Sequence, residues 1–436
     1  MNLAVISVCA LVLAVLVSCV SRLNVGVLAL ALAWIVGVYI GGMPVNAVMA
    51  GFPSQLFLTL TGVTLLFALA QCNGTLGRIT HHAVRMCRGN RGTIPVMFFG
   101  LGAALSSMGP GNIATAALLA PLAMATAAGT GIPLFLMAIM VGNGANSGAL
   151  SPFAPTGIIV NGLMARNGMP GFELLTYGYN LLAHAAVAFG GYALFGGLKL
   201  FRGGGVAVPV VRLKPDATEM VRLKPDATEK GRTGDADESA GPFERRHWIT
   251  IGVIGALILS VILANVNVGM GAFLGSVVLV LTGSADDAEA IKRMPWRVIV
   301  MVCGVTVLIA LVEKAQGIDL LVSLVAKVAT AGTITGVAAL LTGVVSVYSS
   351  TSGVVLPAFL PMVPGLADAL PGASAVGIAM SMNIGGHLVD VSPLSTIGAL
   401  CIAGAAGDDG RALFNKLLAW GLSMCVVGAL LCYVVF

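Results

Sequence analysis

Charged residues are scarce in this chain. Only 9% of its 436 residues are Asp, Glu, Lys or Arg, whereas soluble domains carry roughly 25%. Hydrophobic residues make up 58% of the chain, and its mean hydropathy is +0.98. So few charges cannot form a water-exposed surface of ordinary polarity, which excludes a soluble globular protein. The composition predicts an all-α polytopic protein in contact with a lipid bilayer, and the net charge of +5 gives no reason to expect a nucleic-acid partner.

Paired cysteines and catalytic motifs are also missing. The eight cysteines are scattered, and none forms a Cys-x-x-Cys pair. The chain has no Ser-His-Asp pattern, no His-Glu-x-x-His motif and no phosphate-binding loop. These absences argue against a disulfide framework, a metal site and a catalytic centre. We therefore predict a protein that is not an enzyme and that needs no cofactor.

Apolar segments long enough to cross a membrane are abundant instead. One span needs about 20 apolar residues, and we predict about 10 spans. They lie near residues 3–20, 25–42, 55–72, 132–165, 175–200, 247–264, 267–283, 298–313, 373–404 and 413–435. Two further apolar stretches, 94–127 and 332–367, are too long for one span and are interrupted in the middle. We expect these two stretches to form re-entrant hairpins.

A charged stretch over residues 201–246 divides the chain near its middle. It contains the sequence VRLKPDATE twice, at 211–219 and at 221–229. A direct repeat with proline and mixed charge cannot bury a core, so we expect a disordered linker. The Lys and Arg residues of the short loops fall mainly on one side if the N-terminus is outside. This pattern predicts a cytoplasmic linker and extracytoplasmic termini.

Polar breaks recur in the same order on either side of the linker. SSMGPGNIATAALLAP at 106–121 and SVYSSTSGVVLPAFLP at 346–361 each interrupt an apolar stretch. NGANSGALSPFAPTG at 143–157 and NIGGHLVDVSPLSTIG at 383–398 follow at nearly the same distance, and each contains Ser-Pro. Each half crosses the membrane an odd number of times, so the two halves must be inverted. Such repeats are typical of secondary transporters.

The repeat divides the chain into two equivalent regions. The first repeat covers residues 1–200 and the second covers 247–436. Scaffold helices come first in each, at 3–72 and at 247–313. A re-entrant hairpin, a broken helix (132–165 or 373–404) and a final helix (175–200 or 413–435) follow.

The polar breaks are also the predicted site. Irregular backbone at membrane depth is tolerated where it is buried in protein or lines a cavity, and half-helix ends there can bind ions. We predict substrate contacts from Asn112, Ser147, Ser151, Thr156, Thr351, Ser352, Ser392 and Thr396. Candidates for ion coupling are Ser107, Asn112, Asn146, Ser352, His387 and Asp390.

Asp390 is the one acid inside a polar break, and His387 lies three positions before it. An acid at membrane depth is a functional candidate by default; the alternative is a carboxylate that caps a half-helix. A neutral Asp390 could cross with the substrate and release its proton inside, so we predict proton coupling, with sodium as the alternative ion. We expect His184 to be a core histidine satisfied by a neighbour.

These residues resemble a known family. Asn112 with Pro121, and the Thr-Ser pair at 351–352 with Pro361, are similar to the hairpin-tip motifs of the divalent-anion/sodium symporters in the ion transporter superfamily. Residues 1–165 resemble more closely the MatC-type dicarboxylate (malonate) carriers of bacteria. The resemblance implies an elevator mechanism, a homodimer and a multi-pass protein of the bacterial inner membrane.

The chain departs from the symporters at both tips. They carry Ser-Asn-Thr, whereas this chain has Gly-Asn-Ile at 111–113 and Thr-Ser-Gly at 351–353. Sodium therefore has fewer evident ligands here. The leading function is cation-coupled symport of a small dicarboxylate such as malonate, succinate or malate. The alternatives are a proton antiporter or oxyanion exporter of the same superfamily and, in other classes, a membrane-embedded enzyme or a channel.

Overall fold

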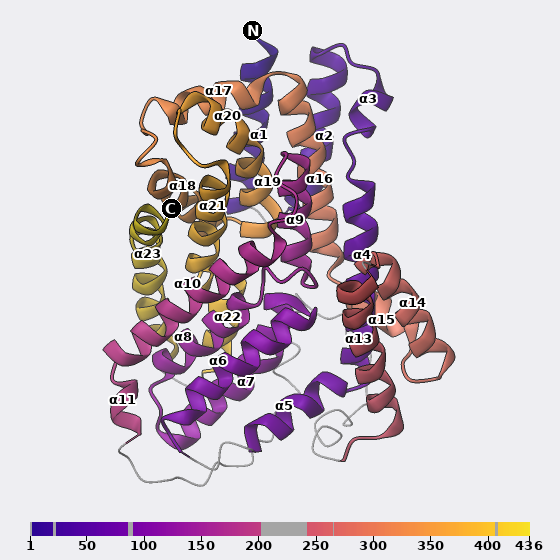
Figure 1. Ribbon diagram of the computed structural model, residues 1–436, viewed down its shortest axis with the longest axis vertical. Coiled ribbons are helices and arrows are strands. Elements are labelled where there is room, and N and C mark those ends of the chain that lie inside the picture. The colour runs from indigo at the N-terminus through magenta and orange to yellow at the C-terminus, as the bar shows by residue number, and fades with distance from the viewer. Residues whose placement is uncertain (1, 21–22, 86–89, 202–241, 265, 406–408) are drawn as a thin grey trace.

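The computed structural model describes residues 2–20, 23–85, 90–201, 242–264, 266–405 and 409–436 (Figure 1). Every regular element in these residues is a helix, and no strand occurs among them. The duplicated segment at 211–229 lies outside the described residues. The chain is a helical membrane protein, as its composition predicts.

Six of the described helices are long and apolar enough to cross a membrane. They are Ser54–Cys72, Gly111–Thr130, Trp296–Lys314, Thr351–Ala369, Ala375–Ala403 and Gly410–Val435. Two of them, Gly111–Thr130 and Thr351–Ala369, are the second arms of the expected hairpins. By length and composition these arms could cross fully, so the re-entrant hairpins and the count of about 10 spans stay predictions.

The elements of the first half begin with α1 (Leu3–Val20), α2 (Val25–Trp34), η1 (Ile35–Ile40), α3 (Val45–Met49), α4 (Ser54–Cys72) and α5 (Thr75–Arg85). They continue with α6 (Thr93–Met108), α7 (Gly111–Thr130), α8 (Leu134–Ser147), α9 (Pro155–Arg166), α10 (Glu173–Leu194) and α11 (Gly197–Leu200).

The elements of the second half begin with α13 (Arg245–Ala264), α14 (Val268–Leu281), α15 (Asp287–Arg293), α16 (Trp296–Lys314) and α17 (Gly317–Ala326). The second interrupted stretch forms α18 (Ile334–Tyr348), η4 (Thr351–Val355), α19 (Leu356–Phe359), η5 (Leu360–Met362) and α20 (Val363–Ala369). The last elements are α21 (Ala375–Leu388), η6 (Val389–Val391), α22 (Thr396–Ala403) and α23 (Asp409–Val435).

Two pairs of early helices, one member from each half, share local features. Asn24 caps α2 by accepting from the Gly26 backbone N–H, and Asn267 caps α14 in the same way through the Gly269 and Met270 N–H groups. The sequence Gly-Val-Thr occurs in α4 at 62–64 and in α16 at 304–306. These matches align α2 with α14 and α4 with α16.

The corresponding helices pack across the two halves. Helix α4 packs against α14, and α16 packs against α2. A methyl group on Gly62 would lie 2.4 Å from the Gly269 carbonyl oxygen, and one on Gly304 would lie 2.2 Å from the Gly26 carbonyl oxygen. Small residues allow helix backbones to approach this closely. The two glycine contacts are equivalent, as expected if a pseudo-twofold axis relates the halves.

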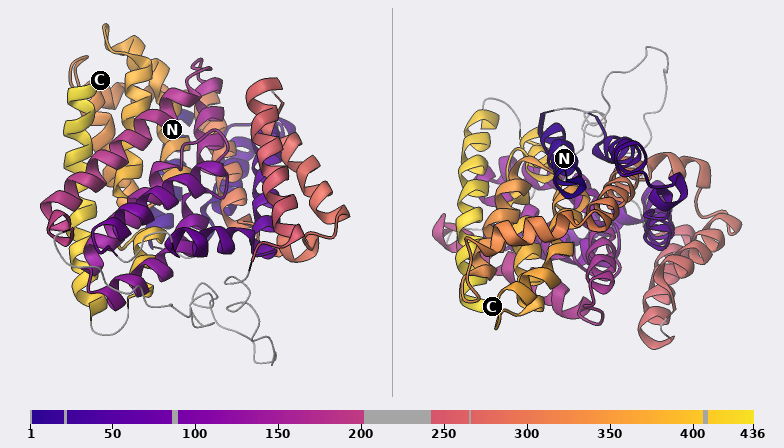
Figure 2. Two further views of the ribbon diagram at one scale, coloured as in Figure 1. Left: turned by 60° about the horizontal axis from the view of Figure 1, so that its bottom comes forward. Right: turned by 90° about the horizontal axis from the view of Figure 1, so that it is seen from above.

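The interrupted elements form the other side of the molecule. Helix α8 packs against α6, α7 and α10, while α21 packs against α18 and α23. Contacts of α7 with α22 and of α10 with α21 join the halves. Both chain ends lie in the upper half of Figure 1, whereas α5 and α11 lie at the bottom. Helices α13 and α14 project as a pair from one side (Figure 2).

Candidate functional site

The first hairpin turns at a pair of glycines. Helix α6 ends at Met108, and α7 begins at Gly111 after Pro110. Gly109 has a φ of 142° and Gly111 a φ of 77°, a region that favours glycine. A methyl group on Gly109 would lie 1.7 Å from the ring of Phe67 in α4. The turn therefore needs glycine both for its backbone and for its close contact with α4.

Side chains next to this turn form hydrogen bonds with the polar break between α8 and α9. Asn112 is 8% exposed, and its Nδ2 donates to Asn146 Oδ1 at 2.8 Å. Ser151 Oγ donates to the Ser107 carbonyl oxygen at 2.7 Å, and Ser107 Oγ lies 2.9 Å from Tyr177 Oη. We call Ser107, Asn112, Asn146 and Ser151 the first tip. Four of the predicted site residues therefore meet here.

The breaks after the two hairpins are built alike. A methyl group on Gly157 would lie 1.9 Å from the Ser151 carbonyl oxygen, and one on Gly398 would lie 2.0 Å from the Ser392 carbonyl oxygen. In each half the chain folds tightly around the carbonyl of a Ser-Pro serine. The next half-helix begins immediately after this turn.

The second hairpin is interrupted by a hydroxyl-rich segment. Ser350 Oγ caps η4 by accepting from the Gly353 N–H at 3.2 Å. Thr351 Oγ1 donates to Asp390 Oδ1 at 2.7 Å, and the Ser346 hydroxyl bonds the Thr351 hydroxyl. We call Ser346, Thr351 and Asp390 the second tip. A chain of side-chain bonds thus joins this hairpin to its break, as Asn112 and Asn146 do in the first half.

Asp390 is not the cap of the half-helix that follows it. The cap of α22 is Ser395, whose Oγ accepts from the Gly398 N–H at 3.3 Å. The same hydroxyl donates to the Asp390 and Ser392 carbonyl oxygens. The half-buried Asp390 carboxylate faces Thr351 instead. This arrangement favours the functional interpretation of Asp390 over the capping one.

Several predicted residues lie apart from the two bonded tips. Ser147 Oγ donates to Gly144 O within its own helix at 2.7 Å, and Thr156 is buried in the first turn of α9. Ser352 is half-buried on η4, and Thr396 is exposed at the first residue of α22. Ser392 is 1% exposed, and its hydroxyl has no hydrogen-bond partner within the described residues.

Helix α10 contributes residues that the sequence analysis did not assign to the site. Asn180 Nδ2 donates to the Asn146 carbonyl oxygen at 2.8 Å, and His184 Nδ1 lies 2.9 Å from Asn143 Oδ1. With Thr176, these α10 residues recur every four positions and therefore share one helix face. That polar spacing in an apolar helix was a usable signal. The expected neighbour of His184 exists, but it satisfies only one ring nitrogen.

His387 and Asp390 do not act as one bonded pair. His387 is fully buried, and its Nδ1 lies 2.8 Å from the Asn383 carbonyl oxygen one turn earlier. Asp390 bonds Thr351. Within the part of the chain that the structure describes, no three His, Cys, Asp or Glu side chains gather as they would around a metal ion.

The N-terminal part of the chain matches a known family. Residues 1–149 match the model of the dicarboxylate carrier protein MatC N-terminus. Over these residues the chain is similar to the MatC carriers. The expected resemblance is thereby confirmed for the region that contains the first tip up to Asn146. The MatC match indicates a transporter and not an enzyme. A search of curated proteins found no match.

Proposed function

We propose that this chain is a secondary active transporter that imports a small dicarboxylate such as malonate, succinate or malate together with a cation. The MatC match supports a carrier of this substrate class. The observation that carries the proposal is the pair of tips, in which Asn112 bonds Asn146 and Thr351 bonds Asp390. Each pair fixes an interrupted hairpin to a broken helix.

The substrate would be held by neutral donors at the two tips. Half-helices begin at α7, η4, α9 and α22, and the positive ends of their dipoles would favour an anion. Amide and hydroxyl side chains such as Asn112 and Ser352 add donors without the cost of a buried charge. Two such tips suit a molecule with two carboxylates.

Movement would follow an elevator mechanism. The hairpins and broken helices form the moving part, and α4 and α16 belong to the scaffold of two inverted repeats. The scaffold touches both hairpin turns: Gly109 lies against Phe67, and a methyl on Gly353 would lie 2.0 Å from the Met301 Cε. These contacts would break and re-form as the moving part slides. The apolar surface on α1, α2, α13 and α14 would face lipid or a second copy in a homodimer within a bacterial inner membrane.

Protons would drive uptake through Asp390. A dianion that enters against a negative interior needs accompanying positive charge, because each elementary charge costs about 2.3 kcal/mol per 100 mV. A protonated Asp390 is neutral and can still bond Thr351. It could cross with the substrate, lose its proton inside and return as the carboxylate.

The test is uptake by the purified full chain in proteoliposomes. A panel of labelled dicarboxylates is offered with an inward proton gradient, with an inward sodium gradient and with neither. We expect proton-driven accumulation of at least one dicarboxylate and none in protein-free liposomes. Accumulation driven by sodium alone would overturn the proton assignment. Proton release without dicarboxylate movement, or efflux of an oxyanion, would instead favour the antiporter or exporter alternative.

A further inference from the structure

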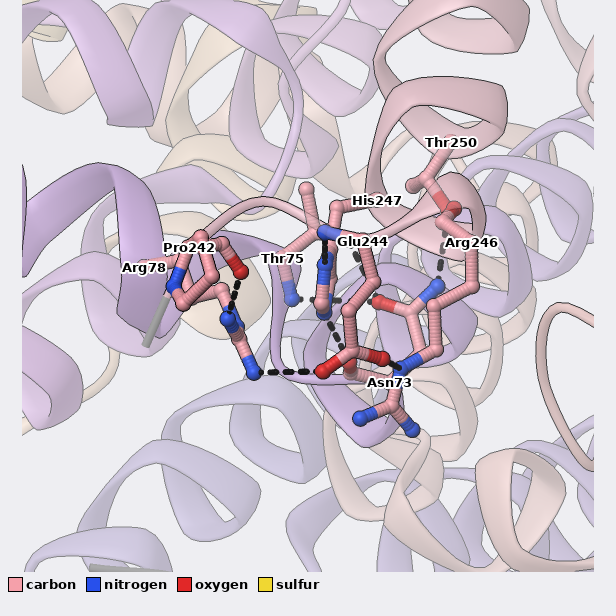
Figure 3. Close-up of polar contacts among 8 residues, drawn as sticks. All are labelled: Asn73, Thr75, Arg78, Pro242, Glu244, Arg246, His247 and Thr250. Atoms are coloured by element: carbon pink, nitrogen blue, oxygen red, sulfur yellow. Dashed lines mark hydrogen bonds and ion pairs between the residues drawn. The ribbon is translucent and has the colours of Figure 1, made fainter. Parts of the chain in front are cut away.

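Three buried histidines of this chain differ in how their ring nitrogens are satisfied. His247 uses both: Nδ1 accepts from the Glu244 N–H at 2.8 Å, and Nε2 lies 3.1 Å from the Asn73 carbonyl oxygen (Figure 3). His184 and His387 are also fully buried. Their Nε2 atoms have no hydrogen-bond partner among the described residues.

The partners on the other side of these two rings determine which nitrogen carries hydrogen. Asn143 Nδ2 donates to the Ile139 carbonyl oxygen at 2.8 Å, so its Oδ1 is the atom that faces His184 Nδ1. His387 Nδ1 faces the Asn383 carbonyl oxygen. Both Nδ1 atoms must therefore donate. A neutral imidazole has one N–H, so both Nε2 atoms are bare acceptors.

Each ring has a further acceptor one turn before it on the same helix. Asn180 Nδ2 is used by backbone carbonyls of α8, which leaves its buried Oδ1 without a partner in the described part of the chain, and Asn383 Oδ1 is in the same state. Helix α10, which carries His184, packs against α21, which carries His387. Buried acceptors without a donor are costly. A proton on either Nε2 would turn one of these bare acceptors into a donor.

Each ring is also connected to one of the tips. Asn143, which bonds His184, is one turn before Asn146, which bonds Asn112 of the first tip. His387 directly follows Gly386, whose carbonyl oxygen accepts from Thr351 of the second tip at 3.3 Å. A charge on the pair would therefore act on an anion held between the tips.

We propose that His184 and His387 together bind one proton that travels with the dicarboxylate, in addition to the proton on Asp390. This inference rests on the proposed function. An unpaired charge in the interior is costly, so the imidazolium is stable only when the dianion is bound nearby. The pair takes one proton and not two, because two adjacent imidazolium charges would repel.

The second proton makes the cycle electroneutral. A dianion with one proton on Asp390 moves one net negative charge inward, since Asp390 returns as a carboxylate. With a further proton on the histidine pair, two protons accompany two negative charges. The loaded and the empty moving part then carry the same charge across the membrane. The protons enter from outside water and leave to inside water, so no other reactant is needed.

Few other ionisable groups surround the pair. Helix α8 contains none, and α21 contains none besides His387. Six ionisable groups on the elements that pack around the pair contact other residues. Asp390 bonds Thr351, Tyr177 bonds Ser107, Tyr192 bonds Gly92, Tyr179 packs on Phe436, Cys425 bonds Gly421 and Cys432 bonds Ser381. Asp390 is the acid among these groups, and the proton that it binds is distinguished from the proton on the histidine pair by the Asp390→Asn variant.

The first test counts protons taken up when the dicarboxylate binds. Calorimetry of the purified full chain is run in buffers of different ionisation enthalpy across the neutral pH range. We expect a maximum close to two protons per dicarboxylate for the wild type and close to one for Asp390→Asn, His184→Asn and His387→Asn. Asparagine keeps an amide donor where Nδ1 stands and removes the titrating ring. His247→Asn is the matched control and should still take up two.

The second test measures charge movement in proteoliposomes. Wild-type uptake should not depend on an imposed membrane potential, whereas uptake by His184→Asn or His387→Asn should slow when the interior is negative. A wild-type count of one proton, or histidine variants that keep the wild-type count and potential independence, overturns the inference and leaves the proposed function intact. Wild type that binds no dicarboxylate overturns the proposed function itself. If an asparagine variant does not fold, the wild-type count still decides.

Discussion

Two polar clusters of this chain differ in how completely they are bonded. The polar corner (Asn73, Thr75, Arg78, Glu244, His247 and Thr250) joins the α4–α5 turn to the start of α13 (Figure 3). Asn73 Oδ1 accepts from the Thr75 N–H at 3.1 Å and from its hydroxyl at 2.6 Å, and Asn73 Nδ2 donates to Thr250 Oγ1 at 2.7 Å. The tips and the histidine pair instead leave several buried polar atoms without a partner in the described residues.

The difference in hydrogen bonding between the two clusters indicates which residues stabilise the fold and which are available for function. A fully bonded buried network rigidifies its surroundings, whereas unsatisfied buried groups need a reason to be kept. The corner fixes the first half of the chain to the second where the linker ends. Under the proposed function, the core keeps bonding capacity that a substrate and its protons would use. We therefore expect changes in the corner to lower stability and changes in the core to alter transport.

The largest expected effect is at the second tip. Asp390→Asn keeps the size of the side chain and an oxygen that can accept from Thr351, but it cannot carry a proton. Gradient-driven uptake in proteoliposomes should fall far below the wild type, because only the proton of the histidine pair would still travel with the dicarboxylate, while exchange of internal for external dicarboxylate persists because it moves no net proton. The exposed Asp368 provides the control Asp368→Asn, which should transport normally. Full gradient-driven uptake by Asp390→Asn would contradict the assignment.

Substrate affinity is the next largest effect. Asn112→Ala and Ser352→Ala each remove one donor to a carboxylate, a loss of about 1.5–3 kcal/mol or roughly ten- to a hundredfold in Kd. Equilibrium binding of the dicarboxylate measures this loss. Thr126→Val removes a hydroxyl that bonds only within α7, to the Leu122 carbonyl oxygen, and should bind like wild type. If Asn112→Ala and Ser352→Ala both bind like wild type, the site lies elsewhere.

A moderate effect on stability is expected in the polar corner. Arg78 is 3% exposed and donates to the Pro242 carbonyl oxygen and to Glu244 Oε1, the latter at 3.0 Å. Arg78→Ala should lower the free energy of unfolding by about 1–3 kcal/mol, because two hydrogen bonds from a buried charged donor are lost.

The control for Arg78 is an exposed ion pair. Arg293 lies 3.0 Å from Glu289 with both side chains nearly half exposed, so Arg293→Ala should cost less than about 1 kcal/mol. Thermal unfolding in detergent compares the two variants, and dicarboxylate binding should stay unchanged in both. A large loss of affinity in Arg78→Ala would show that the corner acts on the site.

The smallest effect is expected in the linker. Deletion of residues 211–220 removes one VRLKPDATE copy and leaves a tether long enough for the same gap. Uptake by protein that reaches the membrane should match the wild type. Reduced uptake would assign a role to the duplication.

Local chemistry made much of the architecture predictable. Gly109 and Pro110 cannot continue a helix, so the interruption between α6 and α7 could be located from the residues alone. The Ser-Pro pairs located both later breaks in the same way. Small amphipathic elements such as α3 and α15 were not foreseen, because they are short and have no long apolar run.

The partners of individual side chains could not be predicted in this way. Ser107 and Asn112 were expected to serve the site, but nothing in their neighbourhood indicated that Tyr177 or Asn146 would bond them. His184 was expected to be an ordinary core histidine. Its second nitrogen became informative only when the positions of Asn143 and His387 were known.

The sequence by itself determined that this chain is a helical membrane protein with polar breaks in a repeated order. Those properties follow from composition and from residues that act on their own backbone, such as glycine, proline and the charged linker. Only the tertiary structure decided that Thr351 meets Asp390 and that Ser395 rather than Asp390 caps α22. It also decided that the Nε2 atoms of His184 and His387 are buried without a partner among the described residues. The physical reason is that a hydrogen bond between residues far apart in the chain depends on how helices pack, which local propensity does not specify.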